Sequence, residues 1–243
     1  MRLWAHRGSH GAAGPLENTL PAFARALADG ADGIELDVHV TSDGVPLVFH
    51  DDDLTRLTGG ADTRRLSTLT SVEVRAVRLS GGVCAPTLAE VLDLVSARIP
   101  VNVELKDAAA VGPVARLLEQ RGGRDEVLLS SFDVEAMQAA LEAMPRIPRA
   151  VVMGTRTLDP TVRLREALPQ QTLARVRASA WHPHAWLVRP GLVAALHRVG
   201  VAVNVWTVND RVTLARLGHA GVDGVFTDIP HALRHFLRNT PRL

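Results

Sequence analysis

The sequence predicts an eight-stranded parallel α/β barrel, the (β/α)₈ or TIM-barrel architecture, in one domain spanning residues 1–243. Strand-like apolar segments alternate with amphipathic helix-like segments along the whole chain, and eight of nine strand segments are each followed by a helix pattern. A length of 243 residues also allows two small domains, but no shift in composition divides the chain. The 47% of hydrophobic residues suffice for one large core.

The expected strands are short apolar runs, and the expected helices show amphipathic periodicity. Asn18 is a candidate N-cap for the first helix. Strands are expected near residues 2–6, 33–40, 45–49, 101–105, 127–130, 150–153, 178–182, 201–207 and 223–227. Helices are expected over residues 20–28, 88–96, 111–120, 134–143, 161–175, 190–199, 211–217 and 232–237.

The segment 45–49 is the one strand that no helix follows directly. It comes after the second strand through Thr41-Ser42-Asp43-Gly44, and Asp-Gly is a strong hairpin-turn signal. Such a hairpin brings His50 back beside Glu35 or Asp37. Residues 51–86 are polar and contain glycine, with one helical stretch near 71–77, so we expect a small insertion over the barrel mouth.

Two strands carry charged or amide side chains on one face only. Aliphatic residues alternate with Glu35 and Asp37 in the segment 34–38, and with Asn102, Glu104 and Lys106 in the segment 101–106. Successive strand side chains point to opposite faces, so each strand has one apolar and one polar face. Buried charges need partners, so these inward faces predict a cation site or a catalytic centre, with a buried salt-bridge cluster as the alternative.

Glu35, Asp37 and Glu104 are hard oxygen donors, which favour Mg²⁺ or Ca²⁺, with Mn²⁺ as a third candidate. Residues two apart on a strand lie about 7 Å apart at the backbone, close enough for both side chains to reach one ion. The alternative is charge pairing of the three acids with Arg7 and Lys106.

His6 closes the first strand, and His50 follows the hairpin. Beside a divalent-ion site the two imidazoles suit opposite roles in proton transfer, although each alone is more often structural. Arg7 and Lys106 supply positive charge for an anion such as phosphate, or neutralise the acids. Lys106 is the only lysine of the chain, which suggests a position that requires a compact ammonium.

Other polar and aromatic residues carry weaker signals. Trp206 either walls a substrate pocket or fills the barrel, and His39 is expected at the rim. His182 and His184 form a candidate metal pair, but the intervening Pro183 favours a structural role at a strand end. The remaining histidines are expected at the surface or at helix ends: His10, His197, His219, His231 and His235.

The composition limits the partners and the compartment. A net charge of +1 and a pI near 8.1 argue against dependence on nucleic acid or an anionic membrane. No apolar run reaches the roughly 20 residues of a membrane span, and no signal-peptide pattern precedes the first strand. The single cysteine, Cys84, excludes an intrachain disulfide. We therefore expect a cytoplasmic protein without stable membrane insertion.

The chain resembles the glycerophosphodiester phosphodiesterase family in a series of motifs that run through nearly its whole length in the family's order. The motifs are Ala5-His6-Arg7-Gly8, Glu17-Asn18-Thr19, Gly33-Ile34-Glu35-Leu36-Asp37-Val38, Thr41-Ser42-Asp43-Gly44, Val48-Phe49-His50-Asp51, Pro86-Thr87-Leu88, Asn102-Val103-Glu104-Leu105-Lys106, Trp206-Thr207-Val208-Asn209 and Gly221-Val222-Asp223-Gly224.

The resemblance implies a barrel of the phosphatidylinositol-phospholipase-C-like type with a small insertion. It implies one divalent ion on Glu35, Asp37 and Glu104, and His6 and His50 as the acid/base pair. The implied reaction is hydrolysis of a glycerophosphodiester to glycerol 3-phosphate and an alcohol, through internal attack by a glycerol hydroxyl and a cyclic phosphate.

Two segments, 79–85 and 155–177, depart from the family pattern where substrate head groups are expected to bind. The sequence therefore leaves open the alcohol group, the physiological metal, which histidine acts first and the oligomeric state. Two other functions are a lysophospholipase D on the same barrel and a non-catalytic glycerophosphodiester-binding protein. The 4% of aromatic residues weighs against the first, and retention of both histidines and all three acids weighs against the second.

Overall fold

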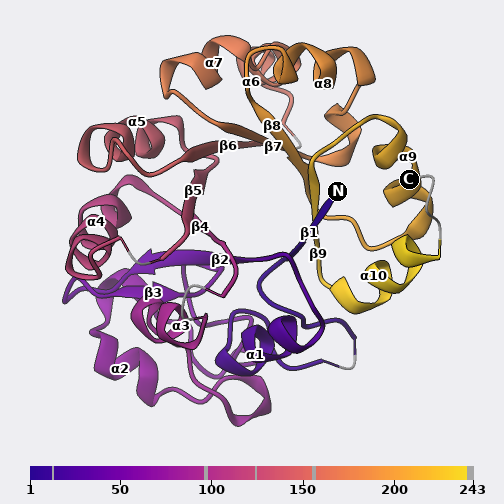
Figure 1. Cartoon of the computed structure of the whole chain (residues 1–243). Coiled ribbons are helices and arrows are strands. Elements are labelled where there is room, and N and C mark those ends of the chain that lie inside the picture. The colour runs from indigo at the N-terminus through magenta and orange to yellow at the C-terminus, as the bar shows by residue number, and fades with distance from the viewer. Residues whose placement is uncertain (13, 96–97, 124, 155–156, 240–243) are drawn as a thin grey trace.

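The computed structural model describes residues 1–12, 14–95, 98–123, 125–154 and 157–239. Among these residues, eight parallel strands close into a barrel surrounded by helices (Figure 1), which confirms the predicted fold class. Closure comes from β1, where Trp4 lies opposite Gly33 of β2 and opposite Phe226 of β9. The parallel strands are β1 (Arg2–Ala5), β2 (Gly33–Val40), β4 (Val101–Leu105), β5 (Val127–Ser131), β6 (Arg149–Met153), β7 (Ala180–Pro183), β8 (Ala202–Val205) and β9 (Gly224–Thr227).

Helices connect the strands, and local chemistry fixes where several of them begin. The side chains of Asp133, Asp159 and Asp210 each accept a hydrogen bond from a backbone N–H of the first turn that follows, as N-cap residues do. The helices are α1 (Leu20–Ala28), α2 (Ser71–Ala76), α3 (Leu88–Val95), α4 (Val111–Gln120), α5 (Val134–Ala143), α6 (Pro160–Ala167), α7 (Gln170–Arg175), α8 (Pro190–His197), α9 (Arg211–His219) and α10 (Pro230–Arg238). Short 3₁₀ turns are η1 (Leu66–Thr68), η2 (Ser80–Gly82), η3 (Ala108–Ala110) and η4 (Ala185–Leu187).

The expectation of one helix over residues 161–175 is wrong, because this segment forms two helices, α6 and α7. Leu168 leaves the helical region, with φ −128° and ψ 69°, and Pro169 caps the second helix. A residue that precedes proline is disfavoured in the helical conformation, which explains the break. The expected end of the helix over 88–96 falls on residue 96, outside the described residues.

The predicted hairpin is confirmed. β3 (Pro46–Val48) pairs antiparallel with β2, with Val38 opposite Val48, and the Phe49 N–H donates to the carbonyl of Asp37 at 3.0 Å. Residues 51–86 continue from this hairpin as η1, α2 and η2. Their apolar side chains form a small core of their own with the hairpin, made of Leu47, Phe49, Leu54, Leu57, Leu66, Leu69, Val74, Leu79 and Ala85.

Large aromatic rings fill the barrel interior. Trp4 packs on Phe226 with ring centroids 5.8 Å apart, and Phe226 packs on His182 at 4.8 Å. Gly33 makes room for this layer, since a Cβ atom there would lie 2.3 Å from the Trp4 ring. The barrel is thus closed below, and the inward side chains at the carboxyl ends of the strands form a pocket above it.

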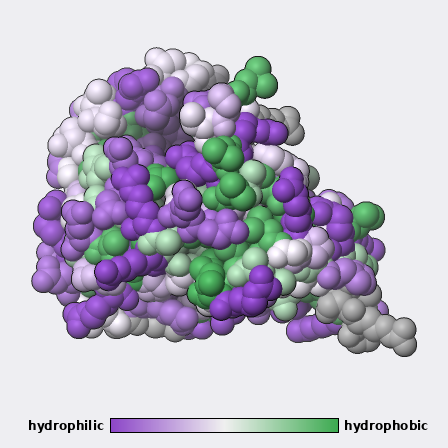
Figure 2. Space-filling model, turned by 90° about the horizontal axis from the view of Figure 1, so that it is seen from above, coloured by the Kyte–Doolittle hydropathy of each residue, from purple (hydrophilic) through white to green (hydrophobic). Residues whose placement is uncertain are grey.

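The outside of the molecule is of mixed polarity, and Figure 2 shows apolar side chains among mostly hydrophilic ones on one side of the barrel. Large exposed apolar residues include Leu158, Leu164, Leu168 and Trp186, around α6 and η4. Among the described residues, no helix is both long and apolar enough to cross a membrane.

Candidate active site

A pocket of about 260 Å³ opens at the carboxyl ends of the strands, where the active sites of such barrels form. Its lining combines charged side chains near the mouth with polar and apolar side chains deeper in the barrel. The lining residues are His6, Arg7, Glu35, His50, Asn102, Glu104, Lys106, Ser130, Phe132, Val152, His182, Trp206, Thr207 and Phe226.

Neighbouring strands bring three carboxylates together at one side of this pocket. Glu35 and Asp37 lie on β2, and the parallel register sets Asp37 beside Glu104 of β4. Carboxylate oxygens of the three residues all lie within 4.8 Å of one another. The oxygens that the sequence predicts as metal ligands are therefore gathered in one place.

Two cations and one amide compensate part of this buried charge. The Lys106 ammonium lies 2.6 Å from both Asp37 Oδ1 and Glu104 Oε1. On the other side of Asp37, Oδ2 accepts a hydrogen bond from Asn18 Nδ2 at 2.7 Å and lies 3.2 Å from Arg7 Nε. The charge pairing that competes with the metal interpretation is thus present for Asp37 and Glu104.

Glu35 is the carboxylate left with least compensation. It accepts a hydrogen bond from the backbone N–H of Arg7 at 2.9 Å, and burial together with the charges of Asp37 and Glu104 raises its pKa well above the usual value. Burial also raises the pKa of Glu104, despite Lys106. For Asp37, burial acts in the same direction, but Lys106 and Arg7 outweigh it and lower its pKa. Three carboxylates face two cations, so a bound cation would supply the missing positive charge, and the oxygen donors suit Mg²⁺ or Ca²⁺.

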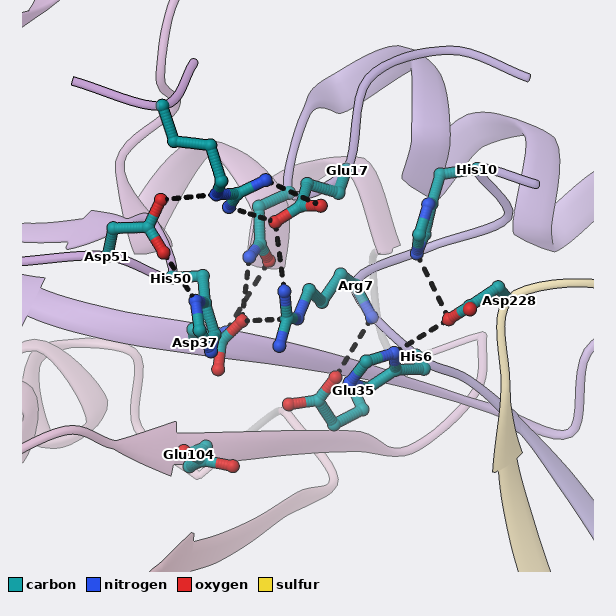
Figure 3. Close-up of polar contacts among 12 residues, drawn as sticks. His6, Arg7, His10, Glu17, Glu35, Asp37, His50, Asp51, Glu104 and Asp228 are labelled. Atoms are coloured by element: carbon teal, nitrogen blue, oxygen red, sulfur yellow. Dashed lines mark hydrogen bonds and ion pairs between the residues drawn. The ribbon is translucent and has the colours of Figure 1, made fainter. Parts of the chain in front are cut away.

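His50 is held by a chain of ion pairs that runs through the inserted segment (Figure 3). Its Nδ1 donates to Asp51 Oδ1 at 2.7 Å, and Asp51 Oδ2 accepts from Arg56 Nε at 2.6 Å. Arg56 also donates to Glu17, which in turn accepts from Arg7. Because a carboxylate only accepts, Nδ1 carries the proton and Nε2 is the basic nitrogen. Burial lowers the pKa of His50, with Lys106 and Arg7 acting in the same direction against Asp37.

His6 is held in the same way from the opposite end of the chain. Its Nδ1 donates to Asp228 Oδ1 at 2.7 Å, and the same oxygen accepts from His10 Nε2 at 3.1 Å (Figure 3). Asn209 fixes Asp228, because its Nδ2 donates to Oδ2 at 2.6 Å and its Oδ1 accepts from the Asp228 N–H at 2.9 Å. Burial raises the pKa of Asp228, but the hydrogen bonds and charges of His10 and His6 outweigh burial and keep that pKa low, so Asp228 is a carboxylate at neutral pH.

The turn after His6 has an unusual backbone that places these groups. Arg7 has a φ of 52°, and Gly8 has a φ of 87°. A Cβ atom at Gly8 would lie 2.7 Å from the Cβ of Ala22 in α1, so the position also requires glycine for space. This turn directs the Arg7 N–H to Glu35 and its guanidinium to Asp37 and Glu17.

Comparison with known proteins places this site in a family. Residues 6–232 match the Glycerophosphoryl diester phosphodiesterase family. The chain belongs to this family. It is 34% identical to a glycerophosphodiester phosphodiesterase of Bacillus altitudinis, over 94% of this chain and 95% of that protein. It is 29% identical to one of Caldanaerobacter subterraneus subsp. tengcongensis, over 96% of each chain.

A solved structure gives the same result. The Oleispira antarctica phosphodiesterase in complex with its product sn-glycerol-3-phosphate superposes with a TM-score of 0.84 at 26% identity, covering 97% of this chain and 96% of that chain. Together these findings make the chain a phosphodiesterase, a hydrolase of phosphoric diesters.

Ring contacts and one hydrogen bond hold Trp206 in the apolar wall of the phosphodiesterase pocket. Trp206 packs edge-on against Phe132 with centroids 5.4 Å apart and against His184 at 5.1 Å. Its Nε1 donates to the His182 carbonyl at 2.9 Å. Trp206 therefore lines the pocket, and its contact with substrate stays a prediction.

His182 and His184 have separate surroundings. His182 is fully buried, its Nε2 lies 3.2 Å from Asn204 Nδ2, and burial lowers its pKa to about 3. His184 Nδ1 accepts from the Trp186 N–H at the start of η4. These contacts are those of structural residues at a strand end.

All predicted site residues line the pocket or its acidic cluster: His6, Arg7, Glu35, Asp37, His50, Glu104, Lys106 and Trp206. The sequence places Asp228 after the last barrel strand, among the polar residues at the carboxyl ends of the strands, but assigns it no specific role; it assigns none to Asp51 and leaves His10 at the surface. The signal for Asp51 is its place directly after His50, and that for Asp228 is its place directly after the last strand. No local signal marks His10, since its partner lies 218 residues away.

Proposed function

We propose that this phosphodiesterase hydrolyses glycerophosphodiesters to glycerol 3-phosphate and an alcohol, with His6 and His50 as the acid/base pair. The observation that carries the proposal is the arrangement of two imidazoles. Each is held at Nδ1 by an aspartate, and both line one pocket beside the acidic cluster. The sn-glycerol-3-phosphate in the related Oleispira antarctica structure supports the same product here.

Glu35, Asp37 and Glu104 would hold one divalent cation, Mg²⁺ or Ca²⁺ with Mn²⁺ as a third candidate. When bound, the cation supplies Lewis acidity toward the phosphate. The fit rests on the under-compensated charge of Glu35 and on the oxygen-only donor set. Arg7 and Lys106 already pair with Asp37 and Glu104 in the structure. A bound cation would add positive charge to these ion pairs and would not replace them.

The other pocket residues would bind the phosphate, transfer protons and line the substrate pocket. Arg7 and Lys106 line the pocket and offer positive charge to the phosphate. One histidine takes the proton of the attacking glycerol hydroxyl at Nε2, and the other gives a proton to the leaving alcohol oxygen. The cyclic phosphate that results is then opened by water, with the two histidines exchanging roles. Trp206 and Phe132 form the apolar wall of the pocket and would contact the apolar part of the substrate.

A turnover screen tests the proposal. Chelator-treated protein is given Mg²⁺, Ca²⁺ or Mn²⁺ with glycerophosphocholine, glycerophosphoethanolamine, glycerophosphoglycerol, glycerophosphoinositol and lysophosphatidylcholine in turn. We expect release of glycerol 3-phosphate from at least one of the four glycerophosphodiesters. Turnover of lysophosphatidylcholine alone would favour a lysophospholipase D, and binding without turnover of any compound would favour a non-catalytic protein. Either result contradicts the proposal.

A further inference from the structure

A second group of metal-ligating side chains lies beside the acidic cluster and shares none of its carboxylates. His6 Nδ1 and His10 Nε2 lie 2.7 Å and 3.1 Å from the same oxygen of Asp228, and ligand atoms of the three residues lie within 4.8 Å of one another (Figure 3). Their side chains are 18%, 20% and 23% exposed, so a small ion can reach them from solvent.

The donor atoms of the two groups differ in kind. Glu35, Asp37 and Glu104 offer oxygen only, which suits Mg²⁺ and Ca²⁺. Two imidazole nitrogens and one carboxylate are instead the donor set of Zn²⁺ sites that keep a fourth position open for water. We propose that His6, His10 and Asp228 form a separate Zn²⁺ site, and that Zn²⁺ bound there inhibits the enzyme.

The three ligands are held in place before any ion binds. Asn209 clamps both the carboxylate and the backbone N–H of Asp228. The loop that carries His10 is tied to the same segment, because the Gly11 N–H donates to the Asp228 carbonyl at 3.2 Å. The backbone N–H of His6 donates to the carbonyl of Thr227 at 2.9 Å. Such outer hydrogen bonds orient ligands and strengthen metal binding.

Zinc binding would change the chemistry of one ring nitrogen. In the structure, the proton on His6 Nδ1 points to Asp228, which leaves Nε2 basic. A zinc ion on Nδ1 would take the place of that proton, so the single proton of the neutral ring would lie on Nε2. The ring then cannot accept a proton at Nε2 and is a poor donor there. The inhibition, unlike the binding, rests on the proposed role of His6.

Binding is tested with the metal alone. Chelator-treated protein is saturated with Mg²⁺ and titrated with Zn²⁺ by calorimetry, and Co²⁺ replaces Zn²⁺ for visible spectroscopy. We expect about one Zn²⁺ per chain and the intense Co²⁺ bands of a four-coordinate site. His10→Ala should weaken Zn²⁺ binding at least about tenfold, the smallest loss typical of removing even an outer-shell partner. Glu104→Gln should leave Zn²⁺ binding in place.

His197→Ala is the matched control, because His197 Nε2 donates to Asp223 Oδ2 at 2.8 Å in another exposed histidine–aspartate pair. This variant should bind Zn²⁺ as the wild type does. Equal Zn²⁺ binding by wild type and His10→Ala overturns the site, and so does the absence of binding to the wild type.

Inhibition is tested on the best substrate with saturating Mg²⁺, each variant being compared with its own zinc-free rate. We expect Zn²⁺ to inhibit wild type and His197→Ala, and to inhibit His10→Ala only at much higher concentration. If Zn²⁺ binds in a His10-dependent way and the rate does not fall, the inhibitory role is overturned while the site stands. Calorimetry and Co²⁺ spectroscopy do not depend on turnover. A failure of the proposed reaction can therefore be distinguished from a failure of the proposed zinc site.

Discussion

Lys106 holds two carboxylates at once, and its size explains why lysine stands there. Its Nζ lies 2.6 Å from both Asp37 and Glu104, and the side chain is only 16% exposed. Although burial opposes it, the two carboxylates raise the pKa of Lys106 above its usual value, so the ammonium stays charged. A compact ammonium can lie within 2.6 Å of both carboxylate oxygens, whereas a planar guanidinium is wider and prefers bidentate contacts.

Lys106→Arg should therefore lower kcat/KM even though it preserves charge, because the fork displaces Asp37 and Glu104. If Lys106 offers its charge to the phosphate as proposed, Lys106→Met should reduce transition-state stabilisation by about 3 kcal/mol, the size of the loss when one oxyanion-hole donor is removed. Steady-state kinetics of both variants decide the matter. An arginine variant as active as the wild type would show that the lone lysine reflects composition alone.

The two histidines give a second prediction at this scale. His6→Ala and His50→Ala should each lower kcat by about 10²–10⁴, because each removes one member of the proposed acid/base pair. The double variant should lose much less than the product of the two single losses, since the groups act as a unit. Near-normal kcat in either single variant, measured on a substrate with a poor leaving group, would make that residue structural.

Burial of the His182 imidazole makes the stability of the protein depend on pH. Its pKa is about 3 in the folded protein and near 6.5 when exposed in the unfolded chain. Below pH 6.5 the unfolded chain binds a proton that the folded protein does not, so the free energy of unfolding falls as the pH drops toward 3. The loss is about 1.4 kcal/mol per pH unit, and none of it occurs above pH 6.5.

We therefore expect His182→Gln to be less sensitive to acid than the wild type. Between pH 7.5 and pH 5, its free energy of unfolding should fall by about 2 kcal/mol less than that of the wild type. Urea denaturation at the two pH values measures this difference. Equal losses in both proteins would show that His182 is not buried in its neutral form.

At the scale of elements, the β2–β3 hairpin is the feature that assembles the site. The alternation of Glu35 and Asp37 with aliphatic residues predicts one polar face, and the Asp43-Gly44 turn predicts the return of His50 to it. Both predictions depend on local periodicity and turn chemistry, which is why the sequence suffices. The break in the helix over 161–175 is marked in the sequence by Pro169, which disfavours the helical conformation of Leu168, and the prediction of one continuous helix gave this signal too little weight.

The inserted segment acts on His50 through Arg56. Arg56→Ala removes the partner of Asp51 and Glu17, so His50 is held less firmly, and kcat should fall by roughly 10–10². Arg65→Ala is the matched control, since Arg65 pairs with Asp52 in the same segment, with both side chains more than 60% exposed. Kinetics and thermal melts of both variants test this. Equal activity of the two variants would contradict a positioning role for Arg56.

At the scale of the whole molecule, barrel closure makes contacts that no local pattern reveals. His6 and Asp228 lie 222 residues apart in sequence and 2.7 Å apart in the structure. The order of strands predicts that both residues meet at the mouth, because β1 and β9 are neighbours once the barrel closes. Which side chains then pair depends on the loop after β1, so the roles of Asp228, Asn209 and His10 emerge only from the structure.

The most direct test of the account follows the reaction by ³¹P NMR on the best glycerophosphodiester of the screen. Chelator-treated protein should leave the diester signal unchanged, and added Mg²⁺ or Ca²⁺ should convert it to the monoester signal of glycerol 3-phosphate. Glu104→Gln should remain folded, bind the cation more weakly and convert the diester far more slowly. Full conversion in excess chelator, or by Glu104→Gln at the wild-type rate, would contradict a catalytic cation on Glu35, Asp37 and Glu104.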